Sequence, residues 1–498
     1  MFRRWFGAAV VVGVVAGTIA GLGVSEAAGG DLDRFTQQRL DWQPCHDDTL
    51  DKAGAQCADV TVPLNYAEPQ GRTITVAISR VPAADQANRR GIMLSNPGGP
   101  GGLGLTFTVE ISQGFPSYQW NQYDLIGMDP RGIGRSTPVH CRWPFGTYGQ
   151  SAGVDLVGFG KSVATQADLA ARCQAAEGDK LPYITTRNTA RDMDVIRAVL
   201  GADRINYFGA SYGTYLGAVF TQLFPERSDR IVLDSAVDPE QWAVGTFRDM
   251  GAADEAALDA WADWTAARDG EYRLGATRSD VRAVVTGLIA EAARQPIRIG
   301  SYDVDEHWLP TVIFENVVSP SHFDVLAGMV RQFADAAAGA PVQPSAKLQA
   351  VLSHFLDASS TDEADDAGAA VRCGDVSESR DPSWYWHNIE ASRVTQPVFG
   401  PLVNNISPCA FWRTPVEPPT AVHNSVPALI LQATGDPLTA HQQAVGLHRV
   451  MTASRMVTLQ DVIVHGVITI PSTCTKQALD AYLRDRTLPT TDLTCHAD

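Results

Sequence analysis

The chain has 498 residues, a formal net charge of −17, 45% hydrophobic residues and 19% charged residues. This composition is that of a folded globular protein, and the length fits a large core that carries an insertion. The strong negative charge argues against nucleic acid and anionic membrane surfaces as partners.

The first residues have the pattern of an export signal. Arg3 and Arg4 form a short basic region, and residues 5–24 carry no charge. Ala27 and the serine two positions before it resemble a signal-peptidase site, which predicts a signal peptide over residues 1–27 and a secreted, extracellular protein. A retained membrane anchor is the alternative, because an uncharged run of this length could just span a bilayer. The cleavage pattern favours removal, and we expect no membrane contact after it.

Eight cysteines follow the predicted signal peptide. An even number of cysteines in an exported chain favours disulfides over metal sites. The sequence contains no Cys-x-x-Cys motif, which argues against a zinc ribbon. Sequence alone does not determine the pairing, and buried free thiols are the alternative. The simplest expectation pairs sequence neighbours: Cys45–Cys57, Cys141–Cys173, Cys373–Cys409 and Cys474–Cys495.

The first half of the mature chain alternates predicted strands with predicted helices. Helical spacing of apolar residues predicts helices over residues 188–200 and 214–223. This rhythm is typical of an α/β protein, with a mostly parallel sheet covered by helices on both faces. Apolar or alternating segments predict strands at residues 73–79, 91–95, 123–128, 205–208 and 230–234.

The rhythm changes after about Pro239. Alanine-rich helical patterns follow, for example over residues 250–268 and 279–294, and we interpret the acidic stretch at residues 359–366 as a solvated loop. Core-type strands resume at residues 427–432.

This change predicts a mainly helical cap inserted into the core. An appended independent domain is the alternative, but the later strands argue against it. We expect the mature chain to divide into a first core part, a cap and a C-terminal core part, at residues 28–239, 240–420 and 421–498.

A serine motif follows one of the predicted strands. Gly209-x-Ser211-x-Gly213 has an apolar strand before it and a small-residue helix after it. Such glycines permit a sharp strand-to-helix turn that exposes the serine hydroxyl, so Ser211 is the candidate nucleophile. The backbone N–H of Tyr212 would then point at a developing oxyanion. An ordinary strand-to-helix turn is the alternative.

A second oxyanion donor must come from an earlier loop. The glycine-rich segment Asn96–Gly102 follows a predicted strand, and glycines let backbone amides approach a substrate closely. We expect Gly99 to be this donor, with a flexible turn as the alternative.

A catalytic serine needs an imidazole base and a carboxylate that orients the base. Asp436 ends a strand-loop segment and is the candidate acid, although it could instead cap the helix near Ala440. His465 follows the last long predicted strand and is the candidate base. His441 and His448 also follow the acid, but they lie seven apart on a predicted helix and are interpreted as surface residues.

Together these motifs resemble the secreted bacterial tripeptidyl aminopeptidases and the related proline iminopeptidases, a family of serine exopeptidases. The resemblance extends from Cys45 to Cys495 and is weakest in the cap. It implies an α/β-hydrolase fold, with Ser211, Asp436 and His465 as triad and Gly99 and Tyr212 as oxyanion donors. The motifs that carry it are Asn96–Gly102, Asp129–Ser136, Gly209–Gly213, Val232–Pro239, Asp436–Thr439 and His465–Gly466.

Two positions depart from the family pattern. Ala440 stands where the family usually has proline, and Val464 stands where a glycine usually precedes the histidine. Neither change removes a reacting group.

The resemblance implies an aminopeptidase that releases short peptides, such as tripeptides, from substrates with free N-termini. Such an enzyme must bind an ammonium group with carboxylates, and Asp375 beside Cys373 is one candidate, with a purely structural acid as the alternative. A carboxylesterase or lipase with the same triad is a second hypothesis, and a non-catalytic binding protein on a hydrolase scaffold is a third. No cofactor or metal is expected.

Overall fold

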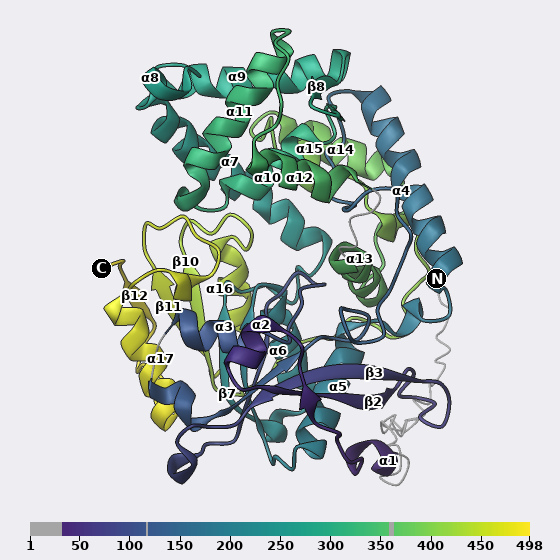
Figure 1. The fold of residues 1–498 in the computed structure, drawn as a ribbon, viewed down its shortest axis with the longest axis vertical. Coiled ribbons are helices and arrows are strands. Elements are labelled where there is room, and N and C mark those ends of the chain that lie inside the picture. The colour runs from purple at the N-terminus through teal and green to yellow at the C-terminus, as the bar shows by residue number, and fades with distance from the viewer. Residues whose placement is uncertain (1–31, 116–117, 358–362) are drawn as a thin grey trace, which may run out of the picture.

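The computed structural model describes residues 32–115, 118–357 and 363–498 (Figure 1). The predicted signal peptide lies outside these residues. None of the helices in the described ranges is long and apolar enough to cross a membrane.

A ten-stranded sheet forms the centre of the lower part of the molecule in Figure 1, with the strand order β1-β2-β3-β5-β4-β6-β7-β10-β11-β12. The strands from β5 to β12 in this order run parallel, and the β1–β2–β3 edge is antiparallel, as is the pairing of β3 with β5. The bounds are β1 (Gln43–Pro44), β2 (Gln56–Pro63), β3 (Thr73–Val81), β4 (Ile92–Asn96), β5 (Asp124–Met128), β6 (Ile205–Ala210), β7 (Ser228–Asp234), β10 (Ala428–Ala433), β11 (Arg455–Leu459) and β12 (Leu493–Cys495).

Helices cover both faces of this sheet. Every residue of the central strands β4, β5 and β10 is buried, as expected for parallel strands packed between two helical layers. On one face, α3 (Phe107–Gly114) and α17 (Thr473–Asp485) pack over apolar side chains such as Phe208. On the other face lie α5 (Thr186–Val199), α6 (Tyr212–Leu223) and α16 (His441–Val450).

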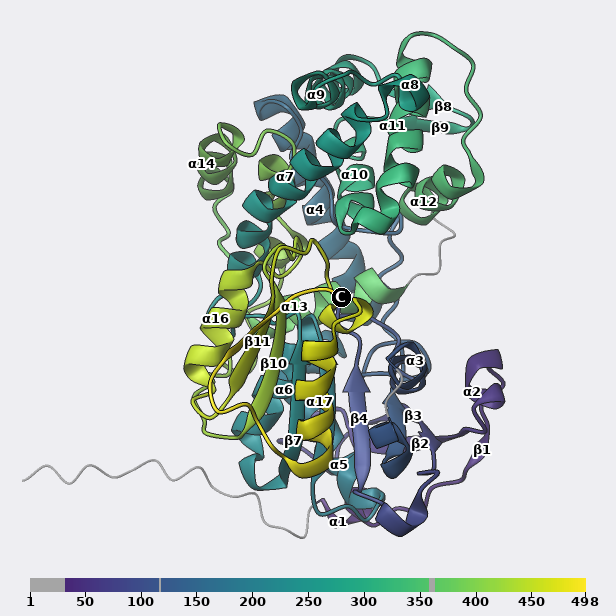
Figure 2. The same cartoon turned by 90° about the vertical axis from the view of Figure 1, so that its left-hand side faces the viewer.

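Helices between β7 and β10 form a second body above the sheet (Figure 2). This cap has its own apolar core, which includes the fully buried Trp261 and Phe333, and a short hairpin of β8 (Ile297–Ile299) and β9 (Tyr302–Val304). Its helices are α7 (Val244–Ala266), α8 (Asp269–Tyr272), α9 (Arg278–Arg294), α10 (Leu309–Val317), α11 (Phe323–Ala337), α12 (Ala346–Leu356), α14 (Pro382–Arg393) and α15 (Gly400–Val403).

Two further helices connect the cap with the core. The long helix α4 (Leu156–Glu177) precedes the nucleophile motif in sequence but runs upward beside the cap and contacts α14 (Figure 1). Helix α13 (Glu363–Asp375) packs against α5 of the core, and its Val371 belongs to the core's apolar cluster. The short helices α1 (Asp33–Thr36) and α2 (Asp48–Lys52) lie near the start of the described chain.

The structure confirms the predicted strands and helices and corrects one interpretation. The acidic stretch is not a solvated loop where the structure describes it, because residues 363–366 begin α13 and Asp366 Oδ2 accepts the N–H of Cys141 at 2.6 Å. The long helix α4 was not predicted. The four disulfides join the expected sequence neighbours: Cys45–Cys57, Cys141–Cys173, Cys373–Cys409 and Cys474–Cys495.

A fully buried ion pair ties α5 to the loop after β5. Arg131 Nε and Nη2 bind the two Asp192 carboxylate oxygens at 2.7 and 2.6 Å, and the Tyr66 hydroxyl donates to Asp192 Oδ1. We expect Asp192→Ala to lower the free energy of unfolding by about 3–5 kcal/mol, because it leaves a guanidinium buried without its counter-charge. Urea denaturation would measure this, with the exposed Asp59→Ala as control; equal stability of the two variants would contradict the prediction.

Candidate active site

Ser211 lies at the junction between β6 and α6. Its backbone has φ 56° and ψ −126°, a conformation that residues other than glycine rarely adopt. A Cβ atom on Gly209 would lie 2.3 Å from the Gly213 carbonyl oxygen, and one on Gly213 would lie 2.5 Å from the Asn96 carbonyl oxygen. The sharp turn therefore needs glycine at both positions, as the motif predicted.

The glycine-rich loop after β4 packs directly against Ser211. A Cβ atom on Gly98 would lie 2.7 Å from Ser211 Cβ, and the Gly98 N–H already donates to Asn96 Oδ1 at 3.1 Å. The Gly99 N–H has no acceptor among the described residues, and the Tyr212 N–H begins a helix and has no intrahelical acceptor. Neither amide is therefore bound to an acceptor in the fold, as a donor to an oxyanion requires.

The Asp129–Ser136 segment holds the far end of this loop. Asp129 Oδ1 accepts the N–H groups of Gly104 at 2.9 Å and Leu105 at 3.2 Å, and Asp129 Oδ2 accepts the N–H of Arg135 at 3.0 Å. A buried carboxylate with several amide donors is well satisfied, so it fixes the loop that carries Gly99.

Asp436 and His465 lie in contact at the same edge of the sheet. His465 Nδ1 is 3.0 Å from both carboxylate oxygens of Asp436. Asp436 Oδ1 also accepts the Leu438 and Thr439 N–H groups at 2.9 Å, and Oδ2 accepts the Thr439 hydroxyl at 2.9 Å. The carboxylate therefore caps its own turn and orients the imidazole; it does not cap α16.

The other two histidines after Asp436 have different surroundings. His448 Nδ1 is 2.7 Å from Ser454 Oγ, and its Nε2 is 3.3 Å from Asp492 Oδ2. His441 Nε2 is buried and has no hydrogen-bond partner in the described chain. Only His465, of these three, contacts Asp436.

Ser211 and His465 are both half-buried at the carboxyl edge of the sheet. In the part of the chain that the structure describes, no hydrogen bond joins Ser211 Oγ to the His465 ring. Such contacts are often long in unliganded hydrolases and shorten when the substrate binds.

Comparison with known proteins agrees with this geometry. Residues 91–284 match the family model described as alpha/beta hydrolase fold, and residues 396–495 match the model described as TAP-like protein. The chain is 33% identical to a tripeptidyl aminopeptidase of Streptomyces lividans, over 93% of this chain and 87% of the relative. The chain belongs to the TAP-like α/β hydrolases. It is therefore a serine hydrolase.

Two further relatives cover nearly the whole of this TAP-like hydrolase. One is the serine protease Hip1 of Mycobacterium tuberculosis, 26% identical over 92% of this chain and 91% of the relative. The other is carboxylesterase B of the same species, 29% identical over 91% of this chain and 89% of the relative.

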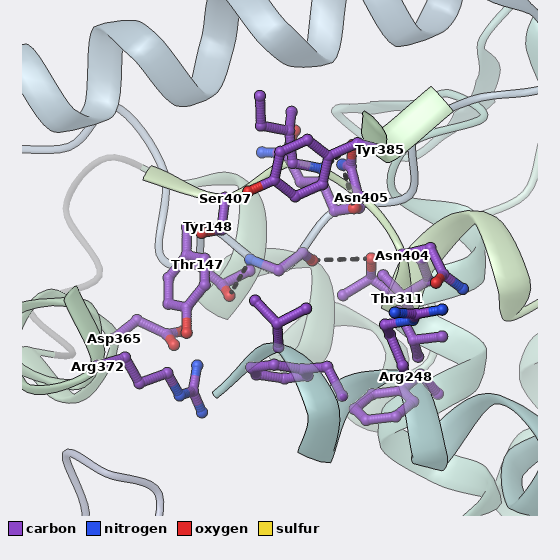
Figure 3. A pocket seen from close by; sticks show the side chains of 18 of the residues that line it. Thr147, Tyr148, Arg248, Thr311, Asp365, Arg372, Tyr385, Asn404, Asn405 and Ser407 are labelled. Carbon is purple, nitrogen blue, oxygen red and sulfur yellow. Dashed lines mark hydrogen bonds between the residues drawn. The ribbon is translucent and has the colours of Figure 1, made fainter. Parts of the chain in front are cut away.

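A cavity in the TAP-like hydrolase lies between the cap helices and α13 (Figure 3). Arg372 of α13 lines it, and Arg372 Nη2 donates to the Gly99 carbonyl at 3.2 Å. The cavity therefore adjoins the loop that packs on Ser211. Its apolar wall is mainly aromatic and includes Tyr148, Phe247, Phe314, Phe355, Trp384 and Tyr385.

Three carboxylates also line this cavity: Glu315, Asp365 and Glu378. The Glu315 side chain is open to the cavity, and the protein packed around it, together with the charge of Asp365, raises the pKa of Glu315 to about 7. Burial raises the pKa of Glu378 despite the hydrogen bond from Ser407 and the charge of Arg372. No sequence motif indicated Glu315 or Glu378 as functional residues. Asp365 lies in the stretch of residues 359–366 that was interpreted as a solvated loop.

Asp375 occupies a different place from these three acids. Its Oδ1 accepts the Thr186 N–H at 2.8 Å, and its Oδ2 accepts the Thr186 hydroxyl at 2.6 Å and the Trp242 indole N–H at 3.0 Å. Burial raises the pKa of Asp375 to about 7. Protein donors thus satisfy both oxygens, and Asp375 is not among the residues that line the cavity.

The charges around His465 predict an alkaline activity profile. Burial lowers the pKa of His465, but the charge of Asp436, its hydrogen bond and the charge of Asp234 outweigh burial and raise the pKa above the usual value. A general base acts when neutral, so kcat/KM should rise with pH through a midpoint above about 6.5. Initial rates from pH 5 to 10 would measure this limb, and a midpoint below the usual histidine value would contradict the prediction.

Proposed function

We propose that this TAP-like hydrolase is a secreted aminopeptidase that releases short peptides, such as tripeptides, from substrates with free N-termini. The observation that carries the proposal is the cavity beside the Gly99 loop, which combines an aromatic wall with three carboxylates. Apolar side chains would pack on the aromatic wall, and an ammonium group would bind the carboxylates. The names of the tripeptidyl aminopeptidase and serine protease relatives support a peptide substrate.

In the proposed reaction, Ser211 attacks the carbonyl carbon of the scissile peptide bond while His465 takes the hydroxyl proton. Asp436 holds the imidazole in the correct tautomer and stabilises the imidazolium. The N–H groups of Gly99 and Tyr212 donate to the oxyanion of the tetrahedral intermediate. The imidazolium then gives its proton to the departing amine, and water, activated by the same base, releases the peptide from Ser211.

The site for the substrate ammonium is proposed at Glu315 and Asp365 rather than at Asp375. Burial and the charge of Asp365 raise the pKa of Glu315, and a bound cation would favour the ionised form of Glu315. Asp375 accepts three hydrogen bonds from the protein and does not line the cavity. We propose a structural role for Asp375, as a link between α13 and the start of α5.

Peptide anilides of one to four residues, each with a free and an acetylated N-terminus, test this function directly. We expect cleavage of the free tripeptide anilide, a large rise of KM on acetylation, and a rise of KM for the free peptide in Glu315→Gln. The exposed Glu271→Gln on α8 is the control and should leave KM unchanged. Equal cleavage of free and acetylated peptides would reject the aminopeptidase.

Hydrolysis of simple esters is the second candidate function. The aromatic wall of the cavity would accept an apolar acyl group, and one relative is named a carboxylesterase. Acyl transfer to water uses the same residues for esters and peptides. A matched set of p-nitrophenyl esters in the same assay separates the two, because activity on esters alone would favour the esterase.

A further inference from the structure

Asp234 joins the backbone of the proposed nucleophile to the loop of the proposed base. This fully buried residue ends β7, between β6 and β10. Its carbonyl oxygen accepts the Ser211 N–H at 2.9 Å. Its carboxylate accepts the N–H of Val467 at 2.8 Å and the N–H of Ile468 at 3.1 Å, two and three residues after His465.

Ser235 extends this link by one more amide. It has φ 58°, and its own N–H donates to the Leu431 carbonyl of β10 at 2.9 Å. Its Oγ accepts the Gly466 N–H at 2.8 Å and lies 3.3 Å from Asp234 Oδ1. The three amides that follow His465 are thus all held by two consecutive residues at the end of β7.

The carboxyl groups near the base and its acid partner come from three elements. Asp436 contacts the ring, and Asp234 acts on it through space. Burial raises the pKa of Asp234 to about 6, although the amides of Ile468 and Val467 and the charge of His465 oppose this rise. Burial, together with the charges of Glu255 and Asp436, raises the pKa of Asp254 on the cap helix α7 well above its usual value.

We propose that Asp234 is a positioning residue that, with Ser235, sets the His465 ring relative to Ser211 and places a second negative charge near the imidazolium. The proposal rests on the proposed triad. The backbone of Asp234 is hydrogen-bonded to Ser211, and its carboxylate is hydrogen-bonded to the loop after His465. Moving the carboxylate would therefore move the loop of the base relative to the nucleophile. Small displacements of a catalytic base cost much in rate, since proton transfer needs close approach.

Two variants separate the geometric part from the electrostatic part. Asp234→Asn removes the charge and weakens the acceptor for the two amides, and we expect kcat to fall by about 10²-fold with little change of KM. The acidic limb of kcat/KM should also move to lower pH, because a charge that raises the pKa of His465 is lost. Ser235→Ala keeps the charge, so kcat should fall without a shift of the limb.

Asp124→Asn is the matched control. Asp124 is a buried carboxylate at the opposite, amino-terminal end of β5, where it binds Arg80 and Arg89. Its loss should change stability but neither kcat nor the acidic limb. A purely structural role of Asp234 predicts the same outcome for Asp234→Asn as for Asp124→Asn.

Several outcomes would overturn the proposal. One is an unchanged kcat and pH profile in Asp234→Asn; another, if that variant does not fold, is an unchanged kcat in Ser235→Ala. A shift of the limb in Asp124→Asn equal to that in Asp234→Asn would also reject it. Failure of the proposed triad is recognised separately, because wild-type protein would then not react with a fluorophosphonate at Ser211. Failure of the aminopeptidase function is recognised by equal cleavage of free and acetylated peptides.

Discussion

Replacement of Ser211 by alanine should lower kcat/KM for a free tripeptide anilide by about 10⁴-fold or more. The hydroxyl is the group that forms the acyl-enzyme, and no neighbouring side chain in the turn can replace it. Binding should persist, because the cavity and the two amides beside the turn are unchanged. The variant should therefore bind a peptide product with nearly the wild-type Kd while it fails to turn over substrate.

Labelling by a fluorophosphonate gives an independent measure of the same serine. Wild-type protein should take up one equivalent, Ser211→Ala none, and the control Ser112→Ala, on helix α3, one equivalent. Mass spectrometry of a tryptic digest would locate the label. Stoichiometric labelling of Ser211→Ala would mean that another residue is the nucleophile, whereas no labelling of either protein would favour the non-catalytic scaffold.

The sequence was most informative where local chemistry restricts the backbone. The turn at Ser211 needs glycine at two positions for steric reasons that a single chain reveals, and the surrounding strand and helix have clear periodicity. Asp436 and His465 could be predicted because each follows a strand of the parallel sheet, and the carboxyl ends of such strands meet at one edge. The contact between the two residues confirms that expectation.

The features of the cap were harder to predict from the sequence, because they depend on contacts between residues that are far apart in the chain. Glu315 lies on α10 and Asp365 on α13, some fifty positions apart in sequence, and only the packed cap brings them to one cavity. Helix α4 was missed because it is only weakly amphipathic and packs partly on the cap. Asp375 was predicted as a candidate for binding the substrate ammonium, with a structural acid as the alternative; its contact with Thr186, 189 positions away, could not be predicted from the sequence.

The role of Asp234 also depends on long-range contacts. In the sequence, its segment, Val232–Pro239, was identified only as one of the motifs that resemble the tripeptidyl aminopeptidases. The residue bonds to amides more than two hundred positions later in the chain, in a loop whose path no local pattern predicts. Apart from the neighbouring Ser235 hydroxyl, the hydrogen-bond donors to the Asp234 carboxylate come from a distant part of the chain.

Replacement of Asp436 by asparagine should lower kcat by about 10³–10⁴-fold with a small effect on KM. The amide would present N–H groups to His465 Nδ1, which stabilises the wrong tautomer and leaves Nε2 protonated and unable to accept the serine proton. The hydrogen bonds from the Leu438 and Thr439 N–H groups can still be made to the remaining oxygen, so the turn should persist, whereas the Thr439 hydroxyl loses the oxygen to which it donates. Circular dichroism and Tm would check that the fold is intact.

The exposed Asp461→Asn, four residues before the histidine, is the control and should keep wild-type kcat. The acidic limb of kcat/KM in Asp436→Asn should shift to lower pH, because the charge that raises the pKa of His465 most is removed. Comparison with Asp234→Asn then ranks the two carboxylates. A loss of less than tenfold in Asp436→Asn, with a larger loss in Asp234→Asn, would assign orientation of the imidazole to the carboxylate at the end of β7 instead of the one after β10.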